Sequence, residues 1–163
     1  MRVLGVDPGT AACGYGVVEK VGGRFLARDY GLVSTPHTAP TPERLHTIYR
    51  EISAILDRWR PDRVAVEELF FARNARTAMA VGQARGVVLL AAALAGIPVV
   101  EYTPLEVKKS VTTYGRGPKD QVGQMVAVIL GLPEVPRPDD VADALAIALC
   151  DALRAGAGLG AAR

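Results

Sequence analysis

Val3-Leu4-Gly5-Val6-Asp7-Pro8-Gly9-Thr10 is the stretch that decides the fold. Its apolar residues predict a short buried strand, and Asp-Pro-Gly-Thr predicts the tight turn that ends it. Two further strands are predicted at Tyr15 to Glu19 and Phe25 to Ser34, with the turn signal Gly22-Gly23 between them. Sequential strands at this spacing favour an antiparallel meander of three.

The remainder of the chain alternates helices and strands. Apolar residues recur at steps of three and four from Leu45 to Trp59, which predicts a helix that Thr41 caps, with Pro42 at its first helical position. The elements expected after it are a strand at Val64–Glu67, a helix at 74–95, a strand at Ile97–Tyr102, a short helix opened by the capping-box pattern Thr103-Pro104-Leu105-Glu106, and helices at 119–130 and 140–153. This order predicts one α/β domain, residues 1–154, with a mixed five-stranded sheet flanked by helices. A flexible Gly- and Ala-rich tail is expected at 155–163.

Composition places the chain among globular proteins. Of its 163 residues, 50% are hydrophobic and 22% are charged, which allows a buried core and argues against disorder. Cys13 and Cys150 lack the paired spacing of a disulfide framework or a zinc site, and they suit a reducing compartment. No signal-peptide pattern is present, and the most apolar run, 87–100, is too short to cross a bilayer. We therefore expect a soluble, cytoplasmic protein with no membrane partner.

The net charge of +2 hides an uneven distribution. Basic residues concentrate between Arg58 and Arg85 and between Lys108 and Lys119, whereas several acids lie inside apolar stretches. If those acids share one pocket, the outer surface is more basic than the net charge indicates.

Four acids stand where a metal site would need them. Asp7 ends the first predicted strand and Glu67 ends the fourth. Asp140 and Asp143 are three residues apart at the start of the last predicted helix, so both project from one face of its first turn. Magnesium prefers hard oxygen ligands and keeps several waters, so a few carboxylates suffice to hold it. Phosphodiester cleavage by two such ions, about 3.5–4 Å apart, activates a water and stabilises the leaving oxygen.

Each acid also has a simpler explanation. Asp7 before Pro-Gly is a common turn residue, and Asp140 could serve only as a favourable charge at a helix N-terminus. Spacing alone does not separate Glu67 from Glu68, or Asp140 from Asp139. The residues by themselves leave these choices open.

Four segments resemble those of the RuvC family, the bacterial Holliday-junction resolvases: Gly5–Thr10, Val66–Phe70, Gly82–Gly86 and Asp140–Ala146. The likeness covers almost the whole chain, in the order and spacing of the family. It implies the ribonuclease-H-like fold and a magnesium-dependent endodeoxyribonuclease that resolves four-way junction DNA in recombination and repair. It also implies a homodimer that nicks two strands of like polarity symmetrically, prefers a short thymine-containing sequence, and cooperates with the branch-migration proteins RuvA and RuvB.

The resemblance assigns the metal ligands. It implies that the catalytic carboxylates are Asp7, Glu67, Asp140 and Asp143, in preference to the neighbouring Glu68 and Asp139. Some relatives have a histidine at the third position, where this chain has an aspartate, so an all-carboxylate site is expected. The expected cofactor is two Mg²⁺ ions per active site, with Mn²⁺ able to substitute.

The resemblance also indicates where DNA would bind. Phe70 matches an aromatic that the family places against bases at the open centre of the junction, and Lys108 and Lys119 match residues that resemble its phosphate contacts. Aromatic and arginine side chains that closely follow Glu67 suit stacking on an unpaired base, at about 1–3 kcal/mol per base. Basic residues beside glycines before a helix N-terminus suit phosphates. The predicted DNA contacts are Phe70, Arg73, Arg76, Lys108, Lys109, Arg116 and Lys119.

These contacts have alternatives. One of Phe70 and Phe71 could be a core residue, and the basic residues could form a solvated face. The small residues between Ala78 and Gly86 are a candidate dimer interface, but they suit packing on the protein's own sheet equally well.

Three other functions fit parts of the sequence. Asp-Pro-Gly-Thr also resembles the phosphate loop of actin-like ATPases, but those enzymes need two lobes and this chain has one. An RNA-processing nuclease of the same fold and an inactive nucleic-acid-binding module are the remaining alternatives. Unused clustered acids would cost stability, which argues against the inactive module.

Overall fold

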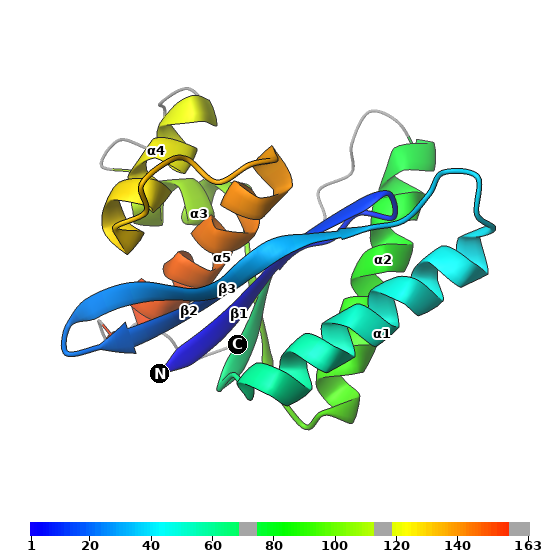
Figure 1. Ribbon diagram of the computed structural model, residues 1–163, viewed down its shortest axis with the longest axis horizontal. Coiled ribbons are helices and arrows are strands. Elements are labelled where there is room, and N and C mark those ends of the chain that lie inside the picture. Colours follow the sequence, from blue (N-terminus) through cyan, green and yellow to red (C-terminus); the bar gives the residue numbers. More distant parts are fainter. Residues whose placement is uncertain (69–74, 113–118, 157–163) are drawn as a thin grey trace.

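A mixed sheet separates two layers of helices in the computed structural model, which describes residues 1–68, 75–112 and 119–156 (Figure 1). Its strands are β1 (Arg2–Asp7), β2 (Ala12–Val21), β3 (Arg24–Ser34), β4 (Arg63–Glu67) and β5 (Val99–Tyr102). Within the described residues these form one five-stranded sheet in the order β3-β2-β1-β4-β5. The first three strands are the predicted antiparallel meander, and β1, β4 and β5 run parallel. The predicted fold class is confirmed.

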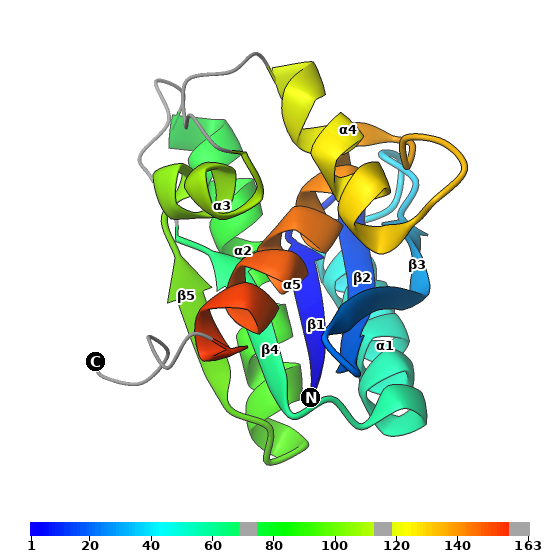
Figure 2. The ribbon, with the colours of Figure 1, turned by 90° about the vertical axis from the view of Figure 1, so that its left-hand side faces the viewer.

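Each face of the sheet has its own core. Helices α1 (Thr41–Trp59) and α2 (Ala75–Leu94) cover one face. Helices α3 (Pro104–Val111), α4 (Lys119–Leu130) and α5 (Asp139–Gly156) cover the other (Figure 2). Side chains alternate along a strand, so Leu4 and Val6 of β1 join the core under α1, whereas Val3 joins the core under α5. By the same alternation, Asp7 belongs to the α5 face.

Two strands begin at least two residues away from their predicted starts. Strand β2 begins at Ala12 rather than Tyr15, because its first residues are small instead of the bulky residues typical of strands, and one of them, Gly14, packs under α5. Strand β5 begins at Val99 rather than Ile97. Pro98 has no N–H to donate, although its carbonyl accepts a hydrogen bond from the N–H of Val64 at 3.0 Å.

The start of α1 differs from the prediction, whereas the start of α3 agrees with it. The expectation that Thr41 caps α1 was wrong: Pro40 occupies the N-cap, no side chain caps the helix, and Thr41 is its first helical residue. The capping box at α3 is confirmed. The Thr103 hydroxyl accepts a hydrogen bond from the N–H of Glu106 at 3.2 Å, and the Glu106 carboxylate accepts one from the N–H of Thr103 at 2.9 Å.

The last helix runs slightly past the predicted end of the domain. Helix α5 continues to Gly156, so the first residues of the expected tail are helical. The remaining tail lies outside the described residues. Among those described, α2 between Thr77 and Leu94 is long and apolar enough to cross a membrane by length and composition alone, a test that helices of soluble proteins also pass.

Helix α5 lies directly on the backbone of β1 and β2 because glycines face it. An added Cβ at Gly5 would collide with the backbone of Ala144 and Ala148, and one at Gly14 would collide with the backbone carbonyl of Asp140. At Gly16 an added Cβ would come within 2.6 Å of the Leu145 side chain. The absence of side chains at these three positions therefore sets how closely α5 approaches the sheet.

Replacing Gly14 with alanine should lower the free energy of unfolding by at least about 2 kcal/mol, because its methyl group meets backbone atoms that cannot rotate away. Gly123→Ala in α4 is the matched control. There the methyl group meets side-chain atoms alone, Val135 at 2.9 Å and Ala142 at 3.8 Å, and an alanine within a helix is favoured over glycine by about 0.5–1 kcal/mol. Urea unfolding of both variants measures the difference, and equal losses would contradict the close approach of α5.

Candidate active site

Asp7 and Glu67 end two neighbouring parallel strands at the centre of the sheet. The register pairs Val6 of β1 with Val66 of β4, so the two acids are the next residues on adjacent strands. Neighbouring strands lie about 4.8 Å apart. Glu67 lies two residues beyond Ala65, which contacts the α5 core, so alternation puts Glu67 and Asp7 on the same face.

The start of α5 lies beside this pair. Asp7 is paired across the β1–β2 ladder with Gly14, and the Asp140 backbone packs on Gly14. Asp143 is three residues further along and therefore on the same helical face as Asp140. Chain segments far apart in sequence thus converge where β1 ends.

Two small cavities connect the four acids. Asp7, Glu67 and Asp140 line a cavity of about 360 Å³. Asp7, Glu67 and Asp143 line a second cavity of about 240 Å³, together with Lys108. Asp7 and Glu67 are common to both cavities, whereas each aspartate of α5 belongs to one.

The acids share cavities without forming a closed ligand cluster. Among the described residues, no three His, Cys, Asp or Glu side chains are arranged so that they could hold a metal ion by themselves. Their chemistry nevertheless fits Mg²⁺, because this ion needs only one or two carboxylates and takes its other oxygens from water and substrate phosphates. A site that is completed by the substrate fits these cavities.

The pKa of the Cys13 thiol reflects the negative charge of this region. Burial raises the pKa of its thiol to about 12; a hydrogen bond with the Gly9 backbone opposes that rise, and the negative charges of Asp7 and Asp140 add to it. Cys13 is fully buried in β2, next to Gly14. Both carboxylates therefore lie near enough to act on one thiol, which supports their convergence.

Native Cys13 should not react with a disulfide reagent at pH 8, because its raised pKa keeps it in the unreactive thiol form and burial blocks access. Cys150 is also buried and its pKa is also raised, chiefly by burial, so both cysteines should react only after unfolding. Val128→Cys, at a side chain that is 72% exposed, is the positive control. Modification of a native cysteine as fast as this control would contradict the burial of the site.

The predicted DNA contacts are only partly described. Lys108 lies in the wall of the smaller cavity, and Lys109 is exposed on α3. Arg76 and Lys119 belong to the first turns of α2 and α4, but their side chains lie outside the described part of the chain. Phe70, Arg73 and Arg116, and the choice between Phe70 and Phe71, also lie outside the described residues.

Two further residues of this region were given no site role in the sequence analysis, where Glu68 was considered only as an alternative to Glu67. Glu68 and Arg85 both line the larger of the two acidic cavities. Arg85 belongs to the segment Gly82–Gly86, which was singled out by resemblance but was given no role. Arg85 is eight residues from Thr77, which also lines the cavity, and residues at this spacing share a helical face. This spacing was the signal in the sequence that could have indicated a role for Arg85.

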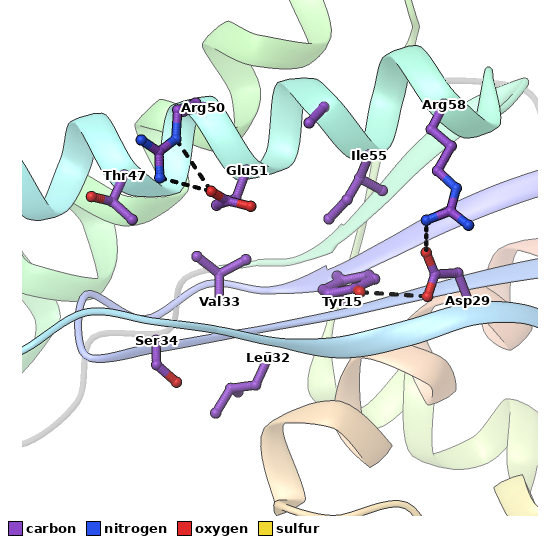
Figure 3. A pocket seen from close by; sticks show the side chains of 11 residues that line it. Tyr15, Asp29, Leu32, Val33, Ser34, Thr47, Arg50, Glu51, Ile55 and Arg58 are labelled. Carbon is purple, nitrogen blue, oxygen red and sulfur yellow. Dashed lines mark hydrogen bonds and ion pairs between the residues drawn. The ribbon is translucent and has the colours of Figure 1, made fainter.

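A still larger cavity lies under α1, away from the four candidate carboxylates. It has a volume of about 470 Å³ and lies between α1 and the neighbouring strands β2 and β3 (Figure 3). Its charges are compensated: Arg58 lies 3.8 Å from Asp29, and Arg50 lies 2.9 Å from Glu51. None of the four candidate carboxylates lines it, and it presents no excess of positive charge for a phosphate.

The fold places the chain among the ribonuclease-H-like nucleases. The structure of Thermus thermophilus RuvC in complex with a Holliday junction substrate superimposes with a TM-score of 0.90 at 42% identity, covering 98% of both chains. The yeast mitochondrial Holliday junction resolvase Ydc2 shares the fold, with a TM-score of 0.68 at 14% identity.

Sequence comparison identifies the family. The family model for crossover junction endodeoxyribonuclease RuvC matches residues 3–151. The RuvC protein of Desulfitobacterium hafniense is 59% identical over 152 residues, which cover 93% of this chain and 92% of the relative. The chain therefore belongs to the RuvC family. It is a nuclease, and membership of this family implies that its activity depends on divalent metal ions.

Proposed function

We propose that this chain resolves Holliday junctions with a metal site formed by Asp7, Glu67, Asp140 and Asp143. Family membership makes it a crossover junction endodeoxyribonuclease of recombination and repair. The observation that carries the residue assignment is the pair of adjoining cavities, which share Asp7 and Glu67 and contain one further aspartate each.

Two Mg²⁺ ions fit this division of ligands. Asp7 and Glu67 would hold the ions from the strand ends, and Asp140 and Asp143 from the first turn of α5, with water and substrate phosphates supplying the other oxygens. The ions, when bound, supply an activated water and stabilise the leaving oxygen of the phosphodiester. The protein's own contribution is to fix the carboxylates on rigid elements, a central strand pair and the first turn of α5. Mn²⁺, which also favours oxygen ligands, should substitute.

Lys108 is the described side chain best placed to bind a phosphate. It lies in the wall of the cavity that contains Asp143, on a helix whose start is fixed by the capping box. Its positive charge offsets part of the repulsion between the carboxylates and an approaching DNA backbone. We assign the remaining DNA contacts to Lys109, Arg76, Lys119, Phe70, Arg73 and Arg116, as the family resemblance implies.

The exposed face of α2 suits a second copy of the chain. Met79, Leu90 and Leu94 are 68%, 54% and 67% exposed, and an added Cβ at Gly86 meets nothing within 4 Å. These residues recur at helical spacing and form an apolar stripe, whereas Ala84 is buried within the protein's own core. A two-fold dimer that covers this stripe would provide the two active sites needed for symmetric nicks. A cytoplasmic location of the protein, and its cooperation with RuvA and RuvB, agree with this function.

The direct test compares substrates. With Mg²⁺, a synthetic four-way junction, a linear duplex and a structured RNA are incubated separately with the protein. We expect paired symmetric nicks in the junction alone. Cleavage of the RNA with an intact junction would favour the RNA-processing alternative, and binding without any cleavage would favour the inactive module.

Asp7→Asn should lower the rate of junction cleavage at least about a hundredfold, because even the outer partners of metal ligands contribute 10–100-fold. Junction affinity should change little, since the phosphate contacts remain. Asp139→Asn is the matched control: this neighbouring acid of α5 is 57% exposed and pairs with Arg137 at 3.0 Å. Single-turnover cleavage and gel-shift titration measure both effects. Normal cutting by Asp7→Asn would show that the site is misassigned.

Leu90→Arg should convert the dimer into a monomer, because two apolar surfaces would each have to bury a charge. The monomer should introduce single nicks in the junction in place of paired ones. Val128→Arg, at an exposed apolar residue of α4, is the control and should remain dimeric. Light scattering after gel filtration gives the mass. A dimeric Leu90→Arg protein would exclude this face as the interface.

A further inference from the structure

The carboxyl end of β5 adjoins Glu67, one of the two acids common to both acidic cavities. The register pairs Glu101 with Val66 and Tyr102 with Glu67. The N–H of Glu68 donates a hydrogen bond to the carbonyl of Tyr102 at 2.8 Å. Any shift of β5 at this point would therefore move the backbone that carries Glu67.

This end of β5 is held from both faces of the sheet. On the α5 face, the Tyr102 hydroxyl donates a hydrogen bond to Asp151 at 2.6 Å, and the fully buried Asp151 lies 3.4 Å from Nε of Arg63. On the α2 face, Nη2 of Arg85 lies 2.5 Å from the Glu101 carboxylate. Side-chain alternation along β5 sends Glu101 and Tyr102 to opposite faces, so the two anchors act on consecutive residues.

Arg85 belongs both to this ion pair and to the wall of the larger acidic cavity. Thr77, Ala78, Val81 and Arg85 form the α2 wall of the cavity that contains Asp7 and Glu67. The Arg85 side chain is only 15% exposed. Within the described residues its Nε is buried without a hydrogen-bond partner, so Glu101 is the carboxylate known to fix this guanidinium. Breaking such a pair leaves a charge in a poorly solvated place.

We propose that Arg85 and Glu101 are a positioning pair, which holds α2 against β5 and thereby fixes Glu67 for metal binding. Neither residue is a ligand in this assignment; both act through the β5 backbone that borders Glu67. The inference rests on the proposed role of Glu67 in the metal site.

Three substitutions and a double variant test the pair. Arg85→Gln and Glu101→Gln should each lower the single-turnover cleavage rate of bound junction at least about tenfold, because small displacements of a catalytic group can cost about a hundredfold. Both should raise the Mg²⁺ concentration needed for half-maximal rate, while junction affinity without metal stays within about twofold of the unmodified protein. The double variant should cut no more slowly than Arg85→Gln, since residues that act as a unit are not additive. Arg85→Lys should retain most of the rate.

Controls separate the possible failures. Glu51→Gln breaks an exposed ion pair on α1 and should leave cleavage unchanged. If Arg85→Gln does not fold, as thermal unfolding will show, Glu101→Gln decides, because Glu101 is 43% exposed and its loss is better tolerated. Cleavage at the normal rate by Glu101→Gln would overturn the proposal. Loss of metal-free junction affinity in Arg85→Gln alone would also overturn it, because Arg85 would then contact DNA directly.

Asp7→Asn and Glu67→Gln are measured in parallel. If both cut normally, the proposed metal site itself fails, whatever the pair variants do. If both lose cleavage while the Arg85 and Glu101 variants keep the normal rate and the normal Mg²⁺ requirement, only the positioning inference fails.

Discussion

The close contact between α5 and the backbone of β1 and β2 is the constraint on which the rest of the structure depends. Glycines at positions 5, 14 and 16 remove the side chains that would hold the helix away. Because Gly14 is the ladder partner of Asp7, the same contact brings the acidic start of α5 beside the carboxylate that ends β1. Packing and the candidate site therefore have one geometric cause, and a change in the first alters the second.

Side-chain alternation in the sheet also separates charged residues from apolar ones. At the ends of β1 and β4, alternation gives the α1 and α2 core its valines and gives the α5 face two carboxylates. Grouping like charges costs free energy, which divalent ions can recover. Lys108 places one compensating positive charge in the wall of the smaller cavity, whereas the charge of Arg85 in the larger one is already paired with Glu101. This distribution explains how a chain with a net charge of only +2 can combine an acidic centre with the capacity to bind DNA.

Much of the fold could be predicted because its elements carry local signals. Periodicity revealed α1, turn residues divided β2 from β3, and the Thr103–Glu106 pattern marked the start of α3. The failures have equally local reasons. Thr41 is a residue type that commonly caps helices, yet the chain enters α1 through Pro40, and no propensity scale anticipates that path. The early start of β2 escaped notice because glycine is a poor strand former unless another backbone packs on it.

The sequence by itself determined the order of strands and helices and, through resemblance, the family and its four candidate carboxylates. Periodicity, turn residues and short motifs indicate those features, because each of these signals extends over only a few residues. Only the tertiary structure decided that Asp7 and Glu67 share two cavities with different partners, and that Arg85 meets Glu101 beside them. Such relations depend on strand register and on how closely a helix approaches a sheet. Both are set by contacts between residues far apart in the chain, which no local pattern records.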